Sequence, residues 1–288
     1  MDRSDLVPAP VLVVGAIASV QSGAAIATKL FPEVGVGGSV LLRLVVSALL
    51  LLGFTRPALG GHPRQDIGLV VAFGLVLAVM NCMFYLAIDR VPLGVGVTVE
   101  FLGPLGVAIA GSRRPLDFVW AALAALGVAM LAGVPGHLDI VGLIFAAAAG
   151  VCWAAYILLA QRVGRAFPGL SGLAIALGVG MIAMIPYGVA SGGRHLLRGG
   201  VIAKGVGIGV LSSAVPYSLE LAALRRLRAA VFGVLMSLEP AMAALSGLVF
   251  LSQRLHWQEW ASIVAVVIAS VGATAKSEIA EPAAEVLG

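Results

Sequence analysis

Long, nearly uninterrupted runs of apolar residues dominate the chain, and short polar segments separate them. The runs do not alternate apolar and polar positions, as the strands of a membrane barrel would. At about 1.5 Å per residue, an α-helix of about 20 residues crosses the hydrocarbon layer of a bilayer. The pattern therefore predicts an all-α membrane protein with ten transmembrane helices, over residues 11–30, 36–55, 67–88, 92–111, 116–134, 141–161, 170–190, 204–224, 229–251 and 257–275.

Composition agrees with a polytopic membrane protein. Hydrophobic residues make up 60% of the 288 and charged residues 11%, against roughly 25% charged residues in an average soluble domain. The net charge of +4 does not indicate nucleic-acid binding, because the basic residues stand singly or in pairs between apolar runs. Such residues set membrane orientation, and placing the N-terminus in the cytoplasm puts most lysines and arginines on that side. We therefore expect both termini in the cytoplasm.

Two end segments need separate interpretation. The N-terminal residues MDRSDLVPAP lack a net-basic region and a clear cleavage site, so the run that follows is predicted to be an uncleaved first helix. The tail 276–288 is rich in Glu, Ala and Pro, which predicts a disordered cytoplasmic tail.

The sequence gives no support for an enzyme, a metal site or a cofactor. Cys82 and Cys152 lie in apolar runs without metal-ligand spacing. No zinc-protease, phosphate-loop or nucleophile-elbow pattern is present. A membrane receptor or an intramembrane enzyme would need a soluble ligand-binding domain or a catalytic cluster, and the sequence contains neither. Nothing in it fixes the oligomeric state.

The two halves of the chain show a weak internal similarity. One constant offset aligns Ala87 with Ala223, Arg90 with Arg226, Pro104 with Pro240 and Gly111 with Gly247. Each half holds five predicted helices, an odd number, so the halves must be inverted relative to each other. We expect a first five-helix repeat at 11–134 and a second at 141–275. Inverted repeats are typical of alternating-access transporters with a site near the bilayer midplane.

Away from the helix ends, four charged residues lie inside predicted helices: Arg43, Glu100, Glu220 and Glu239. A carboxylate at the centre of a membrane helix costs about 2.5–3.5 kcal/mol on insertion scales, so it usually marks a functional site. For Glu220, five residues before Arg225, the alternative is pairing with the basic turn at the membrane surface. For Glu100 and Glu239 the alternative is a buried pair that only fixes helix packing. Arg43 is a candidate partner of an acid or ligand of a substrate carboxylate, and a structural ion pair is an equal alternative.

Two prolines stand close to two of these acids. Pro104 removes the helical hydrogen bond to the carbonyl of Glu100, and Pro240 removes the one to Met236. Free carbonyls at membrane depth are tolerated where they face protein or a wet cavity. In the repeat alignment Glu239 corresponds to Gly103, one turn from Glu100. The sequence therefore predicts that the two acids lie at comparable depth on related helices, on opposite sides of the pseudo-symmetry axis, as a pair that shares a proton or meets a substrate ammonium group.

Other polar and aromatic residues lie well inside the predicted helices, where lining a cavity and packing in the core are equal alternatives. Ser213, Tyr217 and Glu220 follow a spacing that places them on one helix face. The further candidates are Gln21, Ser22, Asn81, Tyr85, Trp153 and Tyr156.

Several segments resemble the EamA-type drug/metabolite transporters, and among them the bacterial exporters of threonine and homoserine. They are VQSGAAIATKLFP (20–32), FYLAIDRVPLGVGVTVEFLGPLGVAIAGSRRPLDFVW (84–120), GVCWAAYILLAQR (150–162), PYSLELAALRRL (216–227) and FGVLMSLEPAMAALSG (232–247). The resemblance implies ten helices around a central cavity that both repeats line. The candidate site residues that lie in the matching segments are Gln21, Ser22, Glu100, Trp153, Tyr156, Tyr217, Glu220 and Glu239.

The resemblance also implies a function. We expect a secondary transporter of the bacterial inner membrane that exports small amino acids such as threonine or homoserine by proton antiport. Its partners would be the amino acid, protons and the lipid bilayer. An exporter of other metabolites or lipophilic drugs on the same fold is the alternative, which more aromatic cavity walls and fewer acids would favour.

Overall fold

The computed structural model describes residues 8–57, 62–110, 115–132, 139–224, 226, 227 and 229–275. All regular structure in these residues is helical. This agrees with the apolar runs, because an α-helix satisfies the backbone hydrogen bonds of a segment within lipid. The elements are α1 (Ala9–Thr28), α2 (Phe31–Thr55), α3 (Arg64–Ile88), α4 (Leu93–Glu100), α5 (Leu102–Ala110), α6 (Pro115–Ala132), α7 (Ile140–Ala166), α8 (Ser171–Gly192), the 3₁₀ turn η2 (Gly193–Leu197), α9 (Gly199–Gly209), the π-helix η3 (Val210–Ala214), α10 (Val215–Leu224), α11 (Ala229–Met236), α12 (Glu239–Leu251) and α13 (Trp257–Ala275).

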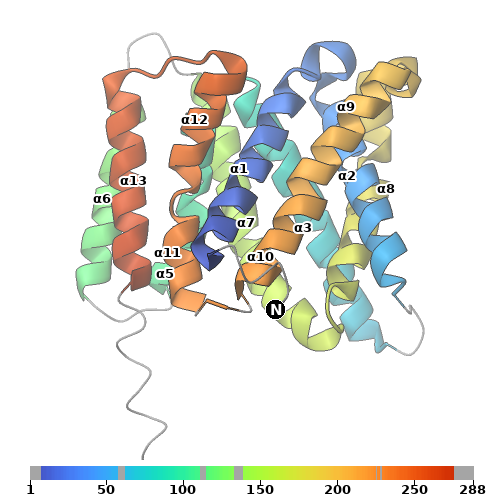
Figure 1. The fold of residues 1–288 in the computed structure, drawn as a ribbon, viewed down its shortest axis with the longest axis horizontal. Coiled ribbons are helices and arrows are strands. Elements are labelled where there is room, and N and C mark those ends of the chain that lie inside the picture. Colours follow the sequence, from blue (N-terminus) through green and yellow to red (C-terminus); the bar gives the residue numbers. More distant parts are fainter. Residues whose placement is uncertain are drawn as a thin grey trace, which may run out of the picture.

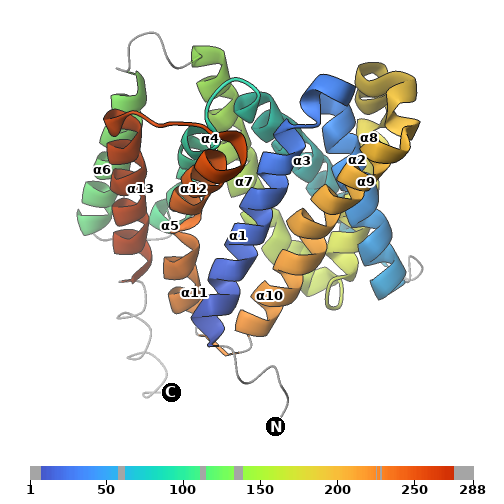
Figure 2. The same cartoon turned by 45° about the horizontal axis from the view of Figure 1, so that its top comes forward.

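The helices form one bundle (Figure 1). Within the described residues, six segments are long and apolar enough to cross a membrane, and four shorter apolar segments bring the total to the ten predicted. Helix α1 begins, and α13 ends, at the same end of the bundle (Figures 1 and 2).

Most helices of the first half pack against helices of the second half. α2 packs on α8, α3 on α7 and α8, and α6 on α13, while α1 lies against α10 and α12. Figure 1 shows the α6–α13 pair at one edge, the α2–α8 pair at the other and α1 between them. Polar residues that are far apart in the sequence therefore meet at the centre of the bundle.

Three of the predicted helices contain local departures from α-helical geometry, which the predicted ranges do not mark. The 92–111 segment breaks at Phe101 and the 229–251 segment breaks at Ser237 and Leu238. Each break begins three residues before a proline, which has no N–H group to donate to the helix. The 204–224 segment contains the π-helix η3. This geometry is rare in proteins, and where it occurs it is often at a functional site.

Helix α2 begins at Phe31, five residues earlier than predicted, and bends at Gly35. Gly35 has a φ of 68°, which is accessible to glycine without strain. Ser191 from α8 donates a hydrogen bond of 3.1 Å to the carbonyl of Val34 at this bend. The bend is thus tied to α8, the main packing partner of α2.

Candidate functional site

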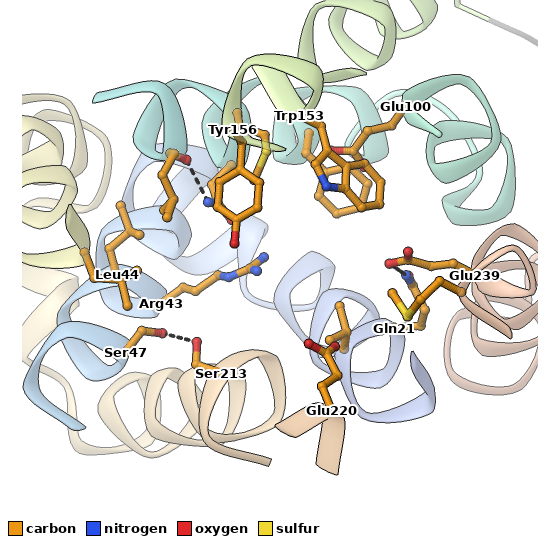
Figure 3. A pocket seen from close by; sticks show the side chains of 17 residues that line it. Gln21, Arg43, Leu44, Ser47, Glu100, Trp153, Tyr156, Ser213, Glu220 and Glu239 are labelled. Atoms are coloured by element: carbon orange, nitrogen blue, oxygen red, sulfur yellow. Dashed lines mark hydrogen bonds between the residues drawn. The ribbon is translucent and has the colours of Figure 1, made fainter. Parts of the chain in front are cut away.

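A cavity of about 290 Å³ lies at the centre of the bundle. Its walls come from α1, α2, α3, α7, α8, α10 and η3, together with the residues at the two helix breaks (Figure 3). The lining residues are Val20, Gln21, Arg43, Leu44, Ser47, Leu77, Met80, Asn81, Phe84, Glu100, Trp153, Tyr156, Leu177, Ser213, Glu220, Met236 and Glu239.

Glu239 and Gln21 form a buried hydrogen-bonded pair on one side of the cavity (Figure 3). The Gln21 Nε2 group donates to Oε1 of Glu239 over 3.1 Å. The amide oxygen of Gln21, Oε1, and the second carboxyl oxygen of Glu239, Oε2, are both buried and have no hydrogen-bond partner. A buried acceptor without a donor costs about 1–3 kcal/mol. The pair therefore holds two buried acceptors without donors at the wall of the cavity.

The local sequence places Glu239 at the start of a helix. Pro240 occupies the first turn of α12, where its missing N–H costs nothing, and Glu239 precedes it as the first helical residue. The free N–H groups of a helix N-terminus favour negative charge nearby. The break before α12 thus creates a suitable place for a carboxylate inside an apolar segment.

Glu100 occupies the end of α4, at the other break. Phe101 still donates to the carbonyl of Val97, but Pro104 cannot donate to the carbonyl of Glu100. That carbonyl lies against α7, where a Cβ added to Gly150 would come within 2.7 Å of the Glu100 oxygen. Gly103 is still closer to α7, because its added Cβ would lie 1.9 Å from the oxygen of Gly150. The absence of side chains at Gly103 and Gly150 lets the broken segment rest on α7.

Arg43 and two serines line the side of the cavity opposite to Glu239 (Figure 3). The Arg43 Nη1 group donates to the Tyr85 hydroxyl at 3.4 Å, and its guanidinium lies 5.6 Å from the centre of that ring. One helical turn along α2, the hydroxyl of Ser47 lies 2.5 Å from the hydroxyl of Ser213 in η3. Ser19 of α1 donates to the carbonyl of Leu211 over 2.7 Å, so η3 is held from both sides.

Aromatic rings form part of the cavity wall. The Trp153 ring contacts that of Phe101 edge-on, with 5.7 Å between centres. Tyr156 lies 5.0 Å from the ring of Phe73. The Asn81 side-chain amide donates to the carbonyl of Leu77 over 2.8 Å.

The structure brings together nine of the residues predicted from the sequence: Gln21, Arg43, Asn81, Glu100, Trp153, Tyr156, Ser213, Glu220 and Glu239. Two others, Ser22 and Tyr85, are absent from the lining. Tyr85 is fully buried against Phe31, with ring centres 5.6 Å apart. The Tyr217 side chain and residues 225 and 228 lie outside the described part of the chain.

Glu220 lines the cavity, so the interpretation that assigned it only to the membrane surface is not needed. The sequence did not identify Ser47, Met80, Phe84 or Met236 as lining residues. In the described part of the chain no group of three or more potential metal ligands comes together. Three carboxyl groups and one guanidinium are the charged side chains among the described lining residues.

Three comparisons relate the chain to known proteins. Residues 140–275 match the EamA-like transporter family. The chain is 42% identical over 267 residues to the threonine/homoserine exporter RhtA of Escherichia coli (strain K12), covering 92% of this chain and 90% of that protein. It is also 42% identical over 262 residues to the RhtA of Salmonella typhimurium (strain LT2), covering 90% and 88%. A protein of known crystal structure with 18% identity superposes with a TM-score of 0.59 over 96% of this chain and 98% of its own, which supports the fold alone.

Proposed function

The chain belongs to the EamA-like transporter family and is not an enzyme, and on that premise we propose that it is a secondary transporter that exports small amino acids such as threonine or homoserine. The observation that carries this proposal is the buried Gln21–Glu239 pair with its two unsatisfied oxygens in the central cavity. The relatives named as threonine/homoserine exporters indicate the substrate class.

An α-ammonium group matches these two oxygens. It carries three N–H donors and one positive charge. One donor would meet Oε2 of Glu239, another Oε1 of Gln21, and Glu220 lies on the same cavity. A charge-assisted hydrogen bond of this kind contributes about 1.5–3 kcal/mol. A neutral lipophilic drug would leave both acceptors without donors, so the cavity favours an amino acid over that alternative.

Arg43 would bind the carboxylate of the substrate. Its planar guanidinium offers paired N–H groups that fit a carboxylate, and it faces the cavity from the side opposite to Glu239 (Figure 3). A cavity of about 290 Å³ is at the small end of ligand pockets, which start at roughly 300 Å³. Size and charge together favour a small zwitterion.

Protons would drive export by competing with the substrate for the carboxylates. A proton that enters from outside neutralises Glu239 or Glu100 and so weakens the attraction for the ammonium group. Substrate that binds from the cytoplasm requires the ionised form and displaces the proton. This exchange is proton antiport.

The proposed architecture is two inverted five-helix repeats, at 11–134 and 141–275, that alternate in opening the cavity to either side. The same offset that aligns Pro104 with Pro240 also aligns the break at Phe101 with the break at Ser237. We place the protein in the bacterial inner membrane with both termini in the cytoplasm. The predicted tail, 276–288, lies outside the described residues.

The test is efflux of labelled threonine from proteoliposomes. An acidic outer buffer should accelerate efflux, and Glu239→Gln and Glu100→Gln should each lose that acceleration. Glu259→Gln is the matched control, since Glu259 is a buried acid on α13 that is not among the cavity-lining residues. Unchanged, pH-driven efflux in both cavity variants would refute the antiport mechanism. Labelled alanine, lysine and a lipophilic cation in the same assay would define the substrate range.

A further inference from the structure

The Ser47–Ser213 pair is the most specific polar feature of the cavity that ammonium and carboxylate binding leave unused. Both serines line the cavity, and both are buried, with 1% and 3% of their surface exposed. Their hydroxyl oxygens are 2.5 Å apart. They come from distant parts of the chain, α2 and η3, so both helices must be in place for the pair to form.

Two hydroxyl groups that bond to each other do not use all their hydrogen-bonding capacity. Each hydroxyl has one proton and two acceptor sites. One proton lies between the two oxygens, and no acceptor for the other is found among the described residues. The pair can therefore donate one hydrogen bond into the cavity and accept others from it.

The π-helix explains why Ser213 faces α2. A π-helix accommodates an extra residue in a turn, which rotates the side chains that follow relative to an α-helix. Ser212 then faces α1, where a Cβ on Gly23 would lie 2.4 Å from its hydroxyl, while the neighbouring Ser213 bonds to Ser47. The local geometry is thus arranged around these hydroxyl groups.

The position of the pair fits one part of the substrate. Arg43 and Ser47 are four residues apart on α2 and share a helix face. Figure 3 shows Arg43 and the serine pair on one side, with Glu239 on the other. An amino acid held by its carboxylate at Arg43 and its ammonium at Glu239 would have its side chain free to reach Ser47 and Ser213.

We propose that Ser47 and Ser213 form a hydroxyl-recognition site, which makes the transporter select amino acids with a side-chain hydroxyl over apolar amino acids of the same shape. This inference rests on the proposed export of small amino acids. Threonine would satisfy the free proton of the pair and donate its own. Valine has a methyl group in the place of that hydroxyl and would leave the pair unsatisfied.

The experiment compares initial counterflow rates of labelled threonine and labelled valine in proteoliposomes at equal, sub-saturating concentrations. We expect the wild type to transport threonine about tenfold faster, a ratio that corresponds to the free energy of one hydrogen bond. Ser213→Val should reduce this ratio to nearly one. Ser213→Thr introduces a side chain of the same shape as valine but keeps the hydroxyl, so it should retain the ratio. A purely structural role of the pair would change rates or stability but not the preference.

Ser270→Ala is the control, because Ser270 forms a buried hydroxyl pair with Ser237 over 2.7 Å and is not a lining residue of the cavity. If both Ser213 variants are inactive, Ser47→Ala makes the same comparison without added bulk. An unchanged threonine preference in an active Ser213→Val or Ser47→Ala variant would overturn the proposal. Equal rates for threonine and valine in the wild type would overturn the hydroxyl site alone, and the absence of transport of either would overturn the proposed function with it.

Discussion

Alanine at Gly103 should separate the broken α4–α5 segment from α7. An added Cβ at Gly103 would lie 1.9 Å from the backbone oxygen of Gly150, and ordinary contact begins at 3.4 Å, so the two backbones must move apart by roughly 1.5 Å. Forced overpacking costs about 1–3 kcal/mol. We expect the upper end of this range, because the obstacle is backbone and cannot rotate away.

Gly106 provides the matched control in the same helix, since a Cβ there would meet nothing within 4 Å. Gly106→Ala should be neutral or slightly stabilising, because alanine is favoured over glycine in a helix by about 1 kcal/mol. For a chain of this size, about 3 kcal/mol corresponds to a decrease of roughly 6 °C in the unfolding midpoint. Purified variants in one detergent, heated at one scan rate, would give this difference.

The same substitution should impair transport. The carbonyl of Glu100 lies against Gly150 at this contact, so a displaced α5 displaces the carboxyl group that lines the cavity. Threonine efflux by Gly103→Ala should therefore fall even at temperatures where the protein is folded. A midpoint equal to that of the wild type, or an equal loss for Gly106→Ala, would refute the close packing of α5 on α7.

Three further predictions concern the ends of the helices and Arg43. Gln253→Ala should lower stability by about 1 kcal/mol, because the Gln253 Oε1 atom accepts from the free N–H of Leu93 at the start of α4, and Gln253→Glu should restore it in thermal unfolding. The hydrogen bond from Arg90, and that from the Val141 amide, lower the pKa of the Asp139 carboxyl group below its usual value. The ionised Asp139 therefore stabilises the folded state at every pH above its unfolded-state pKa, and this stabilisation is lost only as the pH falls through the lower folded-state pKa. Asp139→Asn should therefore lower the midpoint equally at pH 7 and pH 5, and a difference between the two would contradict the assignment. Arg43→Ala should raise the KM for threonine about tenfold or more, whereas Tyr85→Phe should change it less than about threefold, since the Arg43–Tyr85 hydrogen bond is long, at 3.4 Å; equal effects would contradict the role of Arg43.

The helices could be predicted from the sequence because a membrane helix requires a long run of apolar residues. Their interruptions could be predicted only in part. Pro104 and Pro240 predict that the carbonyls of Glu100 and Met236 lack a helical hydrogen-bond donor. The close contact of the broken segment with Gly150 could not be predicted, because Gly150 lies in another helix. The π-helix at η3 has no comparable signal, because its residues VLSSA are compatible with an ordinary helix.

The charged part of the site was predictable for the same reason. A carboxylate in an apolar run is conspicuous, and Glu100, Glu220 and Glu239 all line the cavity. Ser47 was not predictable, because a serine inside a membrane helix commonly bonds to its own backbone. Phe84 and Tyr85 are neighbours that face different directions on a helix, and only the packing of α3 decides that Phe84 lines the cavity.

The two breaks have a joint consequence for the acids. α4 ends at Glu100 and α12 begins at Glu239, and the two half-helices pack together so closely that a Cβ on Gly94 would lie 2.7 Å from the Cα of Ala244. Next to this contact, Gln253 follows α12 and caps the first N–H of α4. Both contacts lie at the start of α4, and the two carboxyl groups lie at the opposite end of the pair, which lines the cavity. The N-terminus of α12 favours an anion, and the C-terminus of α4 favours a cation. One small ligand in the cavity would therefore meet a positive helix end and a negative helix end. A tilt of this pair during transport would move both carboxyl groups together, so that the proposed substrate and proton sites would change their exposure in one step.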